Sequence, residues 1–211
     1  PYINKNLCSE VVINDVAFTI NKFENIDSIN FDRKMNVGFT IKYLNSAHER
    51  YKEMIIGAIR YLIYKYNSYI YIFPQVTVDN DMSYAEDIYN DIEMEYKKNI
   101  IIIKENLTPY QLRFGYSKMK FLIGTRLHST IFAMSAGIPS INIAYHGTKS
   151  QGIYKNMKVE DLLVEQDNFT SDYLIFVIKN VIENYDNYKN LIEDGLFKTR
   201  KIVLEEINKM Y

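Results

Sequence analysis

The sequence predicts an α/β protein with a Rossmann-like, doubly wound parallel sheet and helices on both of its faces. Short apolar runs rich in β-branched residues alternate with longer segments of helical spacing, and this alternation is typical of βαβ units. Strands connected by helices in this way pair in parallel, so the helices cover both faces of the sheet. After residue 165 the strand pattern stops, which predicts a helical C-terminal coat on the same domain.

Five apolar runs predict the buried strands. They lie at residues 36–41, 69–74, 99–104, 120–124 and 140–145. The helices are predicted between them, at residues 45–66, 83–96, 108–118 and 126–136. The first helix follows from Met54, Ala58 and Leu62, because such apolar residues recur there near the 3.6-residue period with charged residues between them.

Residues that favour helix ends mark two of these boundaries. Thr108 and Pro109 supply a capping hydroxyl followed by a proline in the first turn, which starts one helix. Gly137 supplies a C-terminal cap for the helix at 126–136, and Pro139 lies just beyond it.

The pattern divides the chain into three parts. Residues 1–35 are a lead-in or interdomain segment, in which "VAFTI" predicts a short extended piece. Residues 36–165 form the Rossmann-like α/β domain. Residues 166–211 pack on the same domain as two helices, at about 170–186 and about 188–210.

Composition excludes several classes of protein. The chain has 211 residues and is 47% hydrophobic, so it can bury a sizeable core. Its 25 Lys and Arg residues against 26 Asp and Glu residues argue against a protein that coats nucleic acid. Cys8 is the only cysteine, so no internal disulfide can form and a reducing compartment is expected. No apolar run approaches the roughly 20 residues that a membrane helix needs.

The stretch "FLIGTRLH" places a strand, a Gly-Thr turn and a helix start in direct succession. In a doubly wound sheet, ligands bind outside the carboxyl ends of the strands. Gly124 allows close backbone approach, Thr125 can cap the helix, and the amides of residues 126–128 favour an anion. Arg126 adds a forked cation suited to carboxylate or phosphate, and His128 adds a group that titrates near neutrality. The stretch therefore predicts an anion site with an acid–base or hydrogen-bonding partner.

The next predicted strand end contributes to the same site. The segment "IAYHGTKSQG" supplies Tyr145, His146 and Lys149 at this edge of the sheet. A plainer interpretation stays open for the first pair, with Arg126 as a surface ion-pair residue and His128 as a capping or packing residue.

A third strand end is followed by Pro74, Gln75 and a group of acidic residues. The acidic residues are Asp79, Asp81, Glu86 and Asp87. They are interpreted as a loop and a solvated first helical turn, and His48 as a surface residue. Their spacing relative to the histidines is not that of metal ligands, so no metal site is expected. GxSxG, P-loop, HExxH and GxGxxG motifs are absent, so hydrolase, nucleoside triphosphatase and dinucleotide-binding functions lack their defining parts.

With these residues, the chain resembles the C-terminal half of the polysaccharide pyruvyltransferase family. The likeness rests on "FLIGTRLHSTIFAMSAGIPSINIAYHGTKSQGI". This run follows the family's order of a strand, Gly-x-Arg-Leu-His, a small-residue helix ending Gly-x-Pro, a second strand, and then Tyr, Lys and Gly. The matching residues are Gly124, Arg126, Leu127, His128, Gly137, Pro139, Tyr145, Lys149 and Gly152. Weaker likenesses extend from "NDVAFTI" to "VEDLLV".

The resemblance implies a fold like the C-terminal domain of a GT-B-like two-domain enzyme. It also implies transfer of a pyruvyl group from phosphoenolpyruvate to two hydroxyls of a saccharide, which forms a ketal on a surface polysaccharide or its precursor. Arg126 is assigned to the phosphate or carboxylate of the donor, and His128 to proton transfer or a donor hydrogen bond. The other substrate-binding residues implied are Lys42, Gly124, Thr125, Leu127, Tyr145 and Lys149. No cofactor beyond the donor is implied.

Two features depart from the family pattern. Lys42 stands where the family often has an arginine, which keeps the charge but loses the bidentate fork. Family members also have a separate N-terminal α/β domain, which we expect to be missing here. The chain is then part of a longer enzyme or a stand-alone domain. Its expected place is the cytoplasm, which could include the inner face of the membrane.

Two other functions stay open. A nucleotide-sugar glycosyltransferase of the two-domain kind also offers a helix N-terminus to a diphosphate, and carboxylates in "VEDLLVEQD" could hold its ribose. A non-catalytic module of a polysaccharide assembly complex would keep the fold and use it to bind a partner.

Overall fold

Parallel strands form one sheet at the centre of the fold. The computed structural model describes residues 15–44, 48–76, 80–144 and 149–208. Within them the strands are β1 (Asn36–Thr40), β2 (Tyr69–Ile72), β3 (Ile100–Ile102), β4 (Phe121–Gly124), β5 (Ser140–Ala144) and β6 (Leu163–Glu165). Their order in the sheet is β3-β2-β1-β4-β5-β6, and every neighbouring pair is parallel. The direction of winding therefore reverses between β1 and β4, which makes that pair the topological switch point of the sheet.

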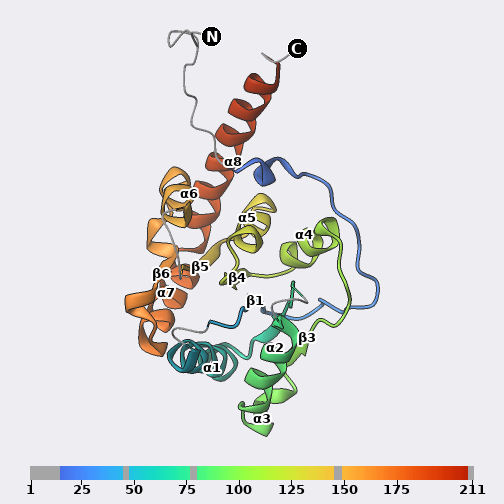
Figure 1. The fold of residues 1–211 in the computed structure, drawn as a ribbon, viewed down its shortest axis with the longest axis vertical. Coiled ribbons are helices and arrows are strands. Elements are labelled where there is room, and N and C mark those ends of the chain that lie inside the picture. Colours follow the sequence, from blue (N-terminus) through green and yellow to red (C-terminus); the bar gives the residue numbers. More distant parts are fainter. Residues whose placement is uncertain (1–14, 45–47, 77–79, 145–148, 209–211) are drawn as a thin grey trace, which may run out of the picture.

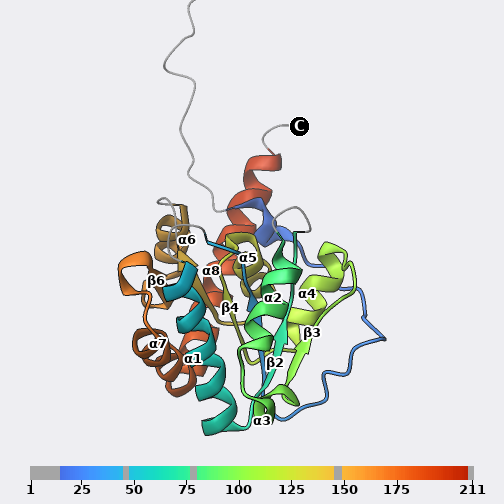
Figure 2. The same ribbon diagram turned by 60° about the horizontal axis from the view of Figure 1, so that its bottom comes forward.

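Helices cover both faces of this sheet, as predicted (Figure 1). They are α1 (His48–Tyr66), α2 (Asp81–Asn90), α3 (Met94–Lys97), α4 (Pro109–Ser117), α5 (Leu127–Ser135), α6 (Lys149–Met157), α7 (Ser171–Glu183) and α8 (Tyr185–Asn208). The described residues also form the short 3-10 helices η1 (Val16–Thr19), η2 (Glu160–Leu162) and η3 (Gln166–Asn168). Helices α1 and α7 pack together on one face, and α4 and α5 pack together on the other. Helices α6, α7 and α8 gather at the β6 end of the sheet, with α2 and α3 at the β3 end (Figures 1 and 2).

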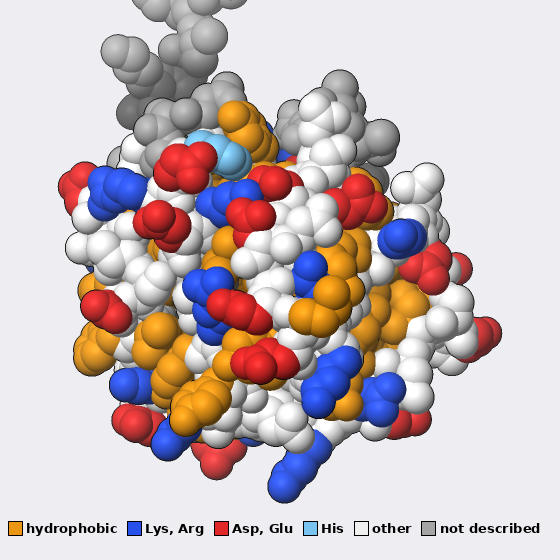
Figure 3. Space-filling model, turned by 90° about the horizontal axis from the view of Figure 1, so that it is seen from below, with side chains coloured by type: hydrophobic (Ala, Val, Ile, Leu, Met, Phe, Trp, Pro, Cys, Tyr) orange, Lys and Arg blue, Asp and Glu red, His pale blue; other side chains and the backbone are white. Residues whose placement is uncertain are grey.

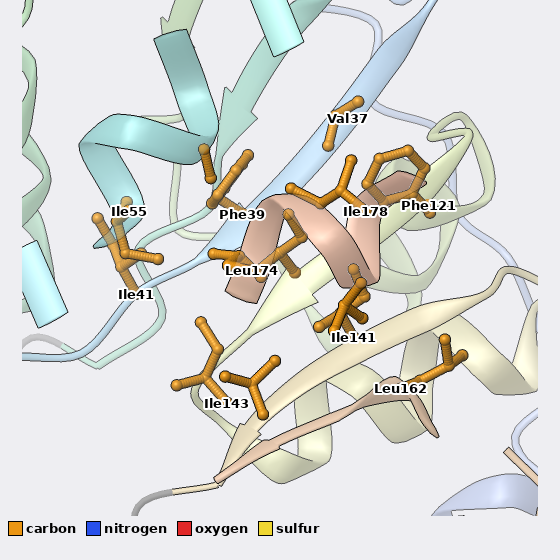
Figure 4. Packing of buried hydrophobic residues seen from close by; sticks show 14 of the residues in the cluster. Val37, Phe39, Ile41, Ile55, Phe121, Ile141, Ile143, Leu162, Leu174 and Ile178 are labelled. Carbon is orange, nitrogen blue, oxygen red and sulfur yellow. The ribbon is translucent and has the colours of Figure 1, made fainter. Parts of the chain in front are cut away.

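The strands are apolar on both sides because both sides are covered. Along β2, Ile70 and Ile72 join one cluster of buried residues, while Tyr71 and Phe73 join a second cluster on the opposite face. Figure 4 shows the first cluster, in which side chains of α7 lie over those of the central strands. The residues labelled there are Val37, Phe39, Ile41, Ile55, Phe121, Ile141, Ile143, Leu162, Leu174 and Ile178.

The predicted helix ends at Thr108 and Gly137 are confirmed. The Thr108 side chain accepts a hydrogen bond from the amide of Gln111, whose side chain in turn accepts from the amide of Thr108. This is a capping box, with Pro109 in the first turn. Gly137 has a φ of 78°, the left-handed conformation that closes a helix, and its amide donates to the carbonyl of Met134.

Three local predictions were wrong, and two elements were not predicted. The helix predicted at 83–96 is two helices, α2 and α3, because the chain turns after Asn90 and buries Ile92 in the core. "VAFTI" is not extended, since Asp15 caps the 3-10 helix η1. Helix α6 and strand β6 were missed. His48, predicted at the surface, has a side chain only 22% exposed.

The segment at 15–35 runs along α8, α5 and α4 before it enters β1 (Figure 1). Two arginines fasten it there. Arg200 donates to the carbonyl of Phe18 at 3.1 Å, and the buried Arg113 donates to the carbonyl of Lys22 at 3.3 Å. Both guanidinium groups also donate to the carbonyl of Ser135 at the C-terminus of α5, where the helix dipole favours positive charge. Burial and the charge of Arg200 lower the pKa of Arg113 to about 10. The division at residue 35 stays a prediction.

The surface carries charges of both signs. On the face seen in Figure 3, Lys and Arg side chains are interspersed with Asp and Glu, and exposed apolar side chains lie between them. Among the described residues, no helix combines the length and the apolar character needed to cross a bilayer.

Candidate functional site

The candidate site lies at the switch point, where β4 ends beside β1. The amide of Thr125 donates to the carbonyl of Thr40 at 3.0 Å, and the Thr125 hydroxyl donates to the same carbonyl at 3.1 Å. Thr125 therefore does not cap α5 as predicted, because its hydroxyl is used to fasten the turn to β1. The N-cap position is occupied by Arg126, whose side chain makes no capping bond.

Gly124 is required here for close packing. A Cβ at this position would lie 2.6 Å from the Thr40 hydroxyl oxygen and 3.0 Å from a methyl group of Thr130. The close backbone approach predicted at Gly124 is therefore made to β1 and α5 of the same chain. It places the first turn of α5 directly on the edge of the sheet.

Arg126 is held by Asp81 in a bidentate ion pair. Its Nε donates to Asp81 Oδ2 at 2.9 Å, and its Nη2 donates to Oδ1 at 2.7 Å. The Asp81 side chain is only 1% exposed, and its carboxylate also accepts from the amides of Gln75 and Val76 at 3.1 and 3.0 Å. The interpretation of Asp81 as part of a solvated turn was wrong. Its carboxylate fixes both the loop after β2 and the direction of the guanidinium.

A second polar link joins the β2 loop to α5. The Ser129 hydroxyl donates to Gln75 Oε1 at 2.6 Å, and Gln75 Nε2 donates to the hydroxyl of Tyr116. Burial raises the pKa of Tyr116, so its hydroxyl stays protonated at neutral pH. Both links reach the first turns of α5, which makes this helix start rigid.

His128 and Lys149 meet at Asp15. Lys149 Nζ lies 2.8 Å from Asp15 Oδ2, and His128 Nε2 lies 3.6 Å from the same oxygen. Burial would raise the pKa of Asp15, but hydrogen bonds from Lys149 and the amide of Ala17, with the nearby positive charge, lower it below its usual value. The side chains of His128 and Lys149 are 64% and 61% exposed, so both are open to a ligand from solvent. The interpretation of His128 as a packing residue is excluded by this exposure.

A cavity of about 230 Å³ lies between the carboxyl ends of β4 and β5. Thr125 and Leu127 line it beside the first turn of α5, and Asn142 lines it from β5. Lys149 and Ser150 line it from the first turn of α6. Two helix N-termini therefore flank the cavity, and helix N-termini favour anions.

The predicted residues that remain are Lys42, Tyr145 and His146. Lys42 follows β1, the strand next to β4, and its side chain is partly buried. Tyr145 and His146 lie outside the described residues. The site also contains Asp15, which lies in the weakly similar stretch "NDVAFTI" and was not predicted as a site residue. It stands 134 residues from Lys149, and no local pattern signals such a contact.

Comparison with known proteins decides the family. A model of the polysaccharide pyruvyl transferase family matches residues 5–147 of the 211. The chain belongs to this family. The resemblance carried by the Gly-x-Arg-Leu-His motif is therefore confirmed, and the family is one of transferases that modify polysaccharides.

One curated relative of this pyruvyl transferase family chain is the amylovoran biosynthesis protein AmsJ of Erwinia amylovora. It is 23% identical over 107 residues, which make up 51% of this chain and 26% of AmsJ. The match thus spans about a quarter of the length of that relative.

Solved structures share the fold. The C-terminal domain of a group 1 family glycosyl transferase (LpcC) from Francisella tularensis has a TM-score of 0.57 and 18% identity, over 80% of this chain and 86% of that one. A UDP-GlcNAc 2-epimerase from Neisseria meningitidis has a TM-score of 0.56 and 17% identity, over 86% of this chain and 46% of the epimerase. These likenesses confirm the predicted GT-B-like domain, and at such identities they show the fold alone.

Proposed function

We propose that this chain provides the donor-binding part of a polysaccharide pyruvyl transferase, with phosphoenolpyruvate as its donor. The observation that carries the proposal is the placement of cationic groups at the start of α5 beside the switch point of the sheet: Arg126 is oriented by Asp81, and His128 and Lys149 meet at Asp15. Phosphoenolpyruvate is a small polyanion with a phosphate and a carboxylate. A guanidinium fork, an ammonium group and helix amides are the groups that recognise such anions.

The proposed reaction joins one donor to two hydroxyls of a saccharide. An acid protonates the methylene carbon of the enol, which leaves a cationic centre at the carbon that bears the phosphate. One hydroxyl attacks this carbon and loses its proton, which restores the acid. The bond from this carbon to the phosphate oxygen then breaks, the second hydroxyl closes the ketal, and its proton leaves with phosphate. The products are one pyruvate ketal and one inorganic phosphate, and positive groups beside the phosphate stabilise the negative charge that it carries away.

Arg126 and His128 take the two main roles in this proposal. Arg126, oriented by Asp81, binds the phosphate or carboxylate together with the amides at the start of α5. His128 delivers the proton or donates a hydrogen bond to the donor, because its side chain is exposed beside the anion site. Lys149 binds the donor in competition with Asp15, while Lys42 and Tyr145 are secondary contacts.

The acceptor is a saccharide in this proposal, and an N-terminal α/β domain would close the cleft over both substrates. The fold by itself is also compatible with a nucleotide-sugar donor, because the solved structures that share it include glycosyl transferases. The donor must therefore be identified by binding.

The test is a thermal unfolding titration with phosphoenolpyruvate, inorganic phosphate and a set of UDP-sugars. A ligand at about 100 times its dissociation constant should stabilise the chain by roughly 2.7 kcal/mol. We expect a phosphoenolpyruvate shift that is lost in Arg126→Lys and His128→Ala. Each shift is measured against the ligand-free Tm of the same variant, so that a loss of stability is not mistaken for a loss of binding.

Arg60→Ala is the matched control, since Arg60 is a partly exposed arginine of α1 that forms an ion pair with Glu93. Its phosphoenolpyruvate shift should equal that of the parent chain. An undiminished shift in both Arg126→Lys and His128→Ala would refute the assignment. A shift with UDP-sugars alone would indicate that the donor is a nucleotide sugar and not phosphoenolpyruvate.

A further inference from the structure

A separate cavity of about 280 Å³ opens between the first turns of α1 and α2. Its volume is close to the lower end of the range of roughly 300–1,000 Å³ seen for small-molecule sites. The side chains that line it are Tyr43, His48, Asn80, Ser83, Tyr84 and Asp87. Because β1 and β2 lead into these two helices, the cavity lies at the same carboxyl edge of the sheet as the proposed donor site.

Three aromatic rings form the apolar part of this cavity. The ring centroid of His48 lies 4.5 Å from that of Tyr43 and 5.2 Å from that of Tyr84. The ring planes meet at 44° and 43°, and Tyr43 and Tyr84 meet at 87°. No two of the three rings are parallel, so they do not form a slot for a flat base. They form a cup, which suits a puckered ring that presents C–H groups to aromatic faces.

Two buried polar atoms of the side chains that line the cavity have no partner among the described residues. Tyr84 is 4% exposed, and its hydroxyl has no hydrogen-bond partner among the described residues. The same holds for Nδ1 of His48. Buried polar groups are nearly always hydrogen-bonded, so an unpaired pair beside a cavity indicates that a ligand supplies the partners.

The charge of the lining favours an uncharged ligand with hydroxyl groups. Asp87 contributes a carboxylate, and none of the six lining side chains is Lys or Arg. Lys52, behind the lining, lies 2.6 Å from Asp87 Oδ2 and holds this carboxylate in place. A phosphate would meet this negative charge, whereas hydroxyl groups can donate to Asp87 and bond with Ser83 and Asn80.

Two buried side chains, Tyr84 and Tyr51, lie between the cavity and the turn of the proposed donor site. Tyr84 stacks on Tyr51 with centroids 6.0 Å apart, and the Tyr51 hydroxyl donates to Thr125 at 3.4 Å. We infer that the cavity is a saccharide subsite that holds one pyranose ring of the acceptor chain. The inference rests on the proposed function for its meaning, because a ring held here would lie at the same carboxyl edge of the sheet as the proposed donor site.

The experiment measures weak binding by saturation-transfer difference NMR on the full chain. The probes are the methyl β-D-pyranosides of glucose, galactose and mannose, with uridine as the flat-ring comparison. We expect a signal from at least one glycoside and a stronger signal from it than from uridine. Tyr43→Ala, which removes an exposed ring, should weaken the binding of that glycoside about tenfold. Tyr84→Phe, which removes only the hydroxyl, should weaken it about threefold to tenfold.

Tyr84→Phe also separates binding from folding. Because its hydroxyl has no partner among the residues that the structure describes, the variant should unfold at the same temperature as the parent or higher while it binds the glycoside less well. Tyr64→Ala is the matched control, since Tyr64 lies on α1 with 81% exposure and does not line the cavity. It should leave the glycoside signal unchanged.

Three results would overturn the inference. They are silence from every glycoside, glycoside binding that Tyr43→Ala and Tyr84→Phe leave intact, and a variant-sensitive uridine signal that exceeds the glycoside signals. The phosphoenolpyruvate titration is run on the same samples. A retained phosphoenolpyruvate shift with no glycoside binding would refute the saccharide subsite alone. Glycoside binding with no phosphoenolpyruvate shift would refute the proposed donor and leave the saccharide subsite supported.

Discussion

Replacement of Asp81 by asparagine tests the ion pair that orients the proposed donor site. The change keeps the size of the side chain but removes its charge and turns one acceptor oxygen into an NH₂ donor. Asp81 accepts from Arg126 through both of its oxygens and from the amides of Gln75 and Val76 through Oδ2. In either orientation of Asp81→Asn, the new NH₂ group faces an N–H of the guanidinium, and in one of them it also faces the two amides, so donors meet donors.

The expected cost follows from the burial of the pair. Removal of one partner of a buried ion pair costs about 3–5 kcal/mol, because the other charge is left uncompensated. Arg126 keeps 16% exposure and some contact with water, while Asp81 is 1% exposed. We therefore expect a loss near the lower end, about 3 kcal/mol, which for a chain of this size lowers Tm by roughly 6–12 °C.

The assay is urea unfolding of Asp81→Asn, Arg126→Gln and the double variant. The coupling energy of the cycle should be about 2 kcal/mol, since the two groups share two charge-assisted bonds. Asp87→Asn is the matched control in the same helix, because Asp87 is 48% exposed and Lys52 keeps Asp91 as a second partner. It should cost less than about 1 kcal/mol. A loss below about 1 kcal/mol in Asp81→Asn would show that the pair holds neither the loop nor the guanidinium.

Two further predictions concern the turn and the cluster beside it. Gly124→Ala should destabilise the chain by about 1–3 kcal/mol, because its methyl group would meet the Thr40 hydroxyl, whereas Gly152→Ala should stabilise it by roughly 0.5–1 kcal/mol, since nothing lies within 4 Å of that helical position. Equal urea midpoints for the two alanine variants would contradict the packing argument. The pKa of Asp15 is lowered in the folded chain, so its ionised form stabilises the fold above about pH 4, and this contribution is lost as pH falls further. The Tm of Asp15→Asn should therefore fall less than that of the parent between about pH 5 and about pH 2. Parallel curves of Tm against pH for the two proteins would refute a stabilising role for the carboxylate.

Local patterns predicted most of the fold because they report on local physics. The capping box at Thr108 and the glycine end at Gly137 depend on residues within one turn of the helix, and both were predicted correctly. Strand β6 could not be found this way, because it has three residues and exists through its pairing with β5. The break between α2 and α3 was missed for a related reason. The helical spacing continues past Asn90, and only the core position of Ile92 turns the chain.

The candidate site shows the same division. Its motif residues Arg126 and His128 stand two positions apart, so one short stretch of sequence predicts them together. Their carboxylate partners come from distant segments. Asp81 lies 45 residues from Arg126, and an interpretation as a solvated turn was the natural one for an acidic residue at a helix start.

The sequence by itself determined the alternation of strands and helices, the Gly-Thr turn between β4 and α5 and the family, since each of these is written in residues close together along the chain. The tertiary structure alone decided which charges are paired, which histidine is exposed and where cavities open. These properties depend on how β1, β4, α2 and the segment around Asp15 meet in space. Coulomb energy and burial act through distance in the folded molecule, and no spacing along the chain encodes them.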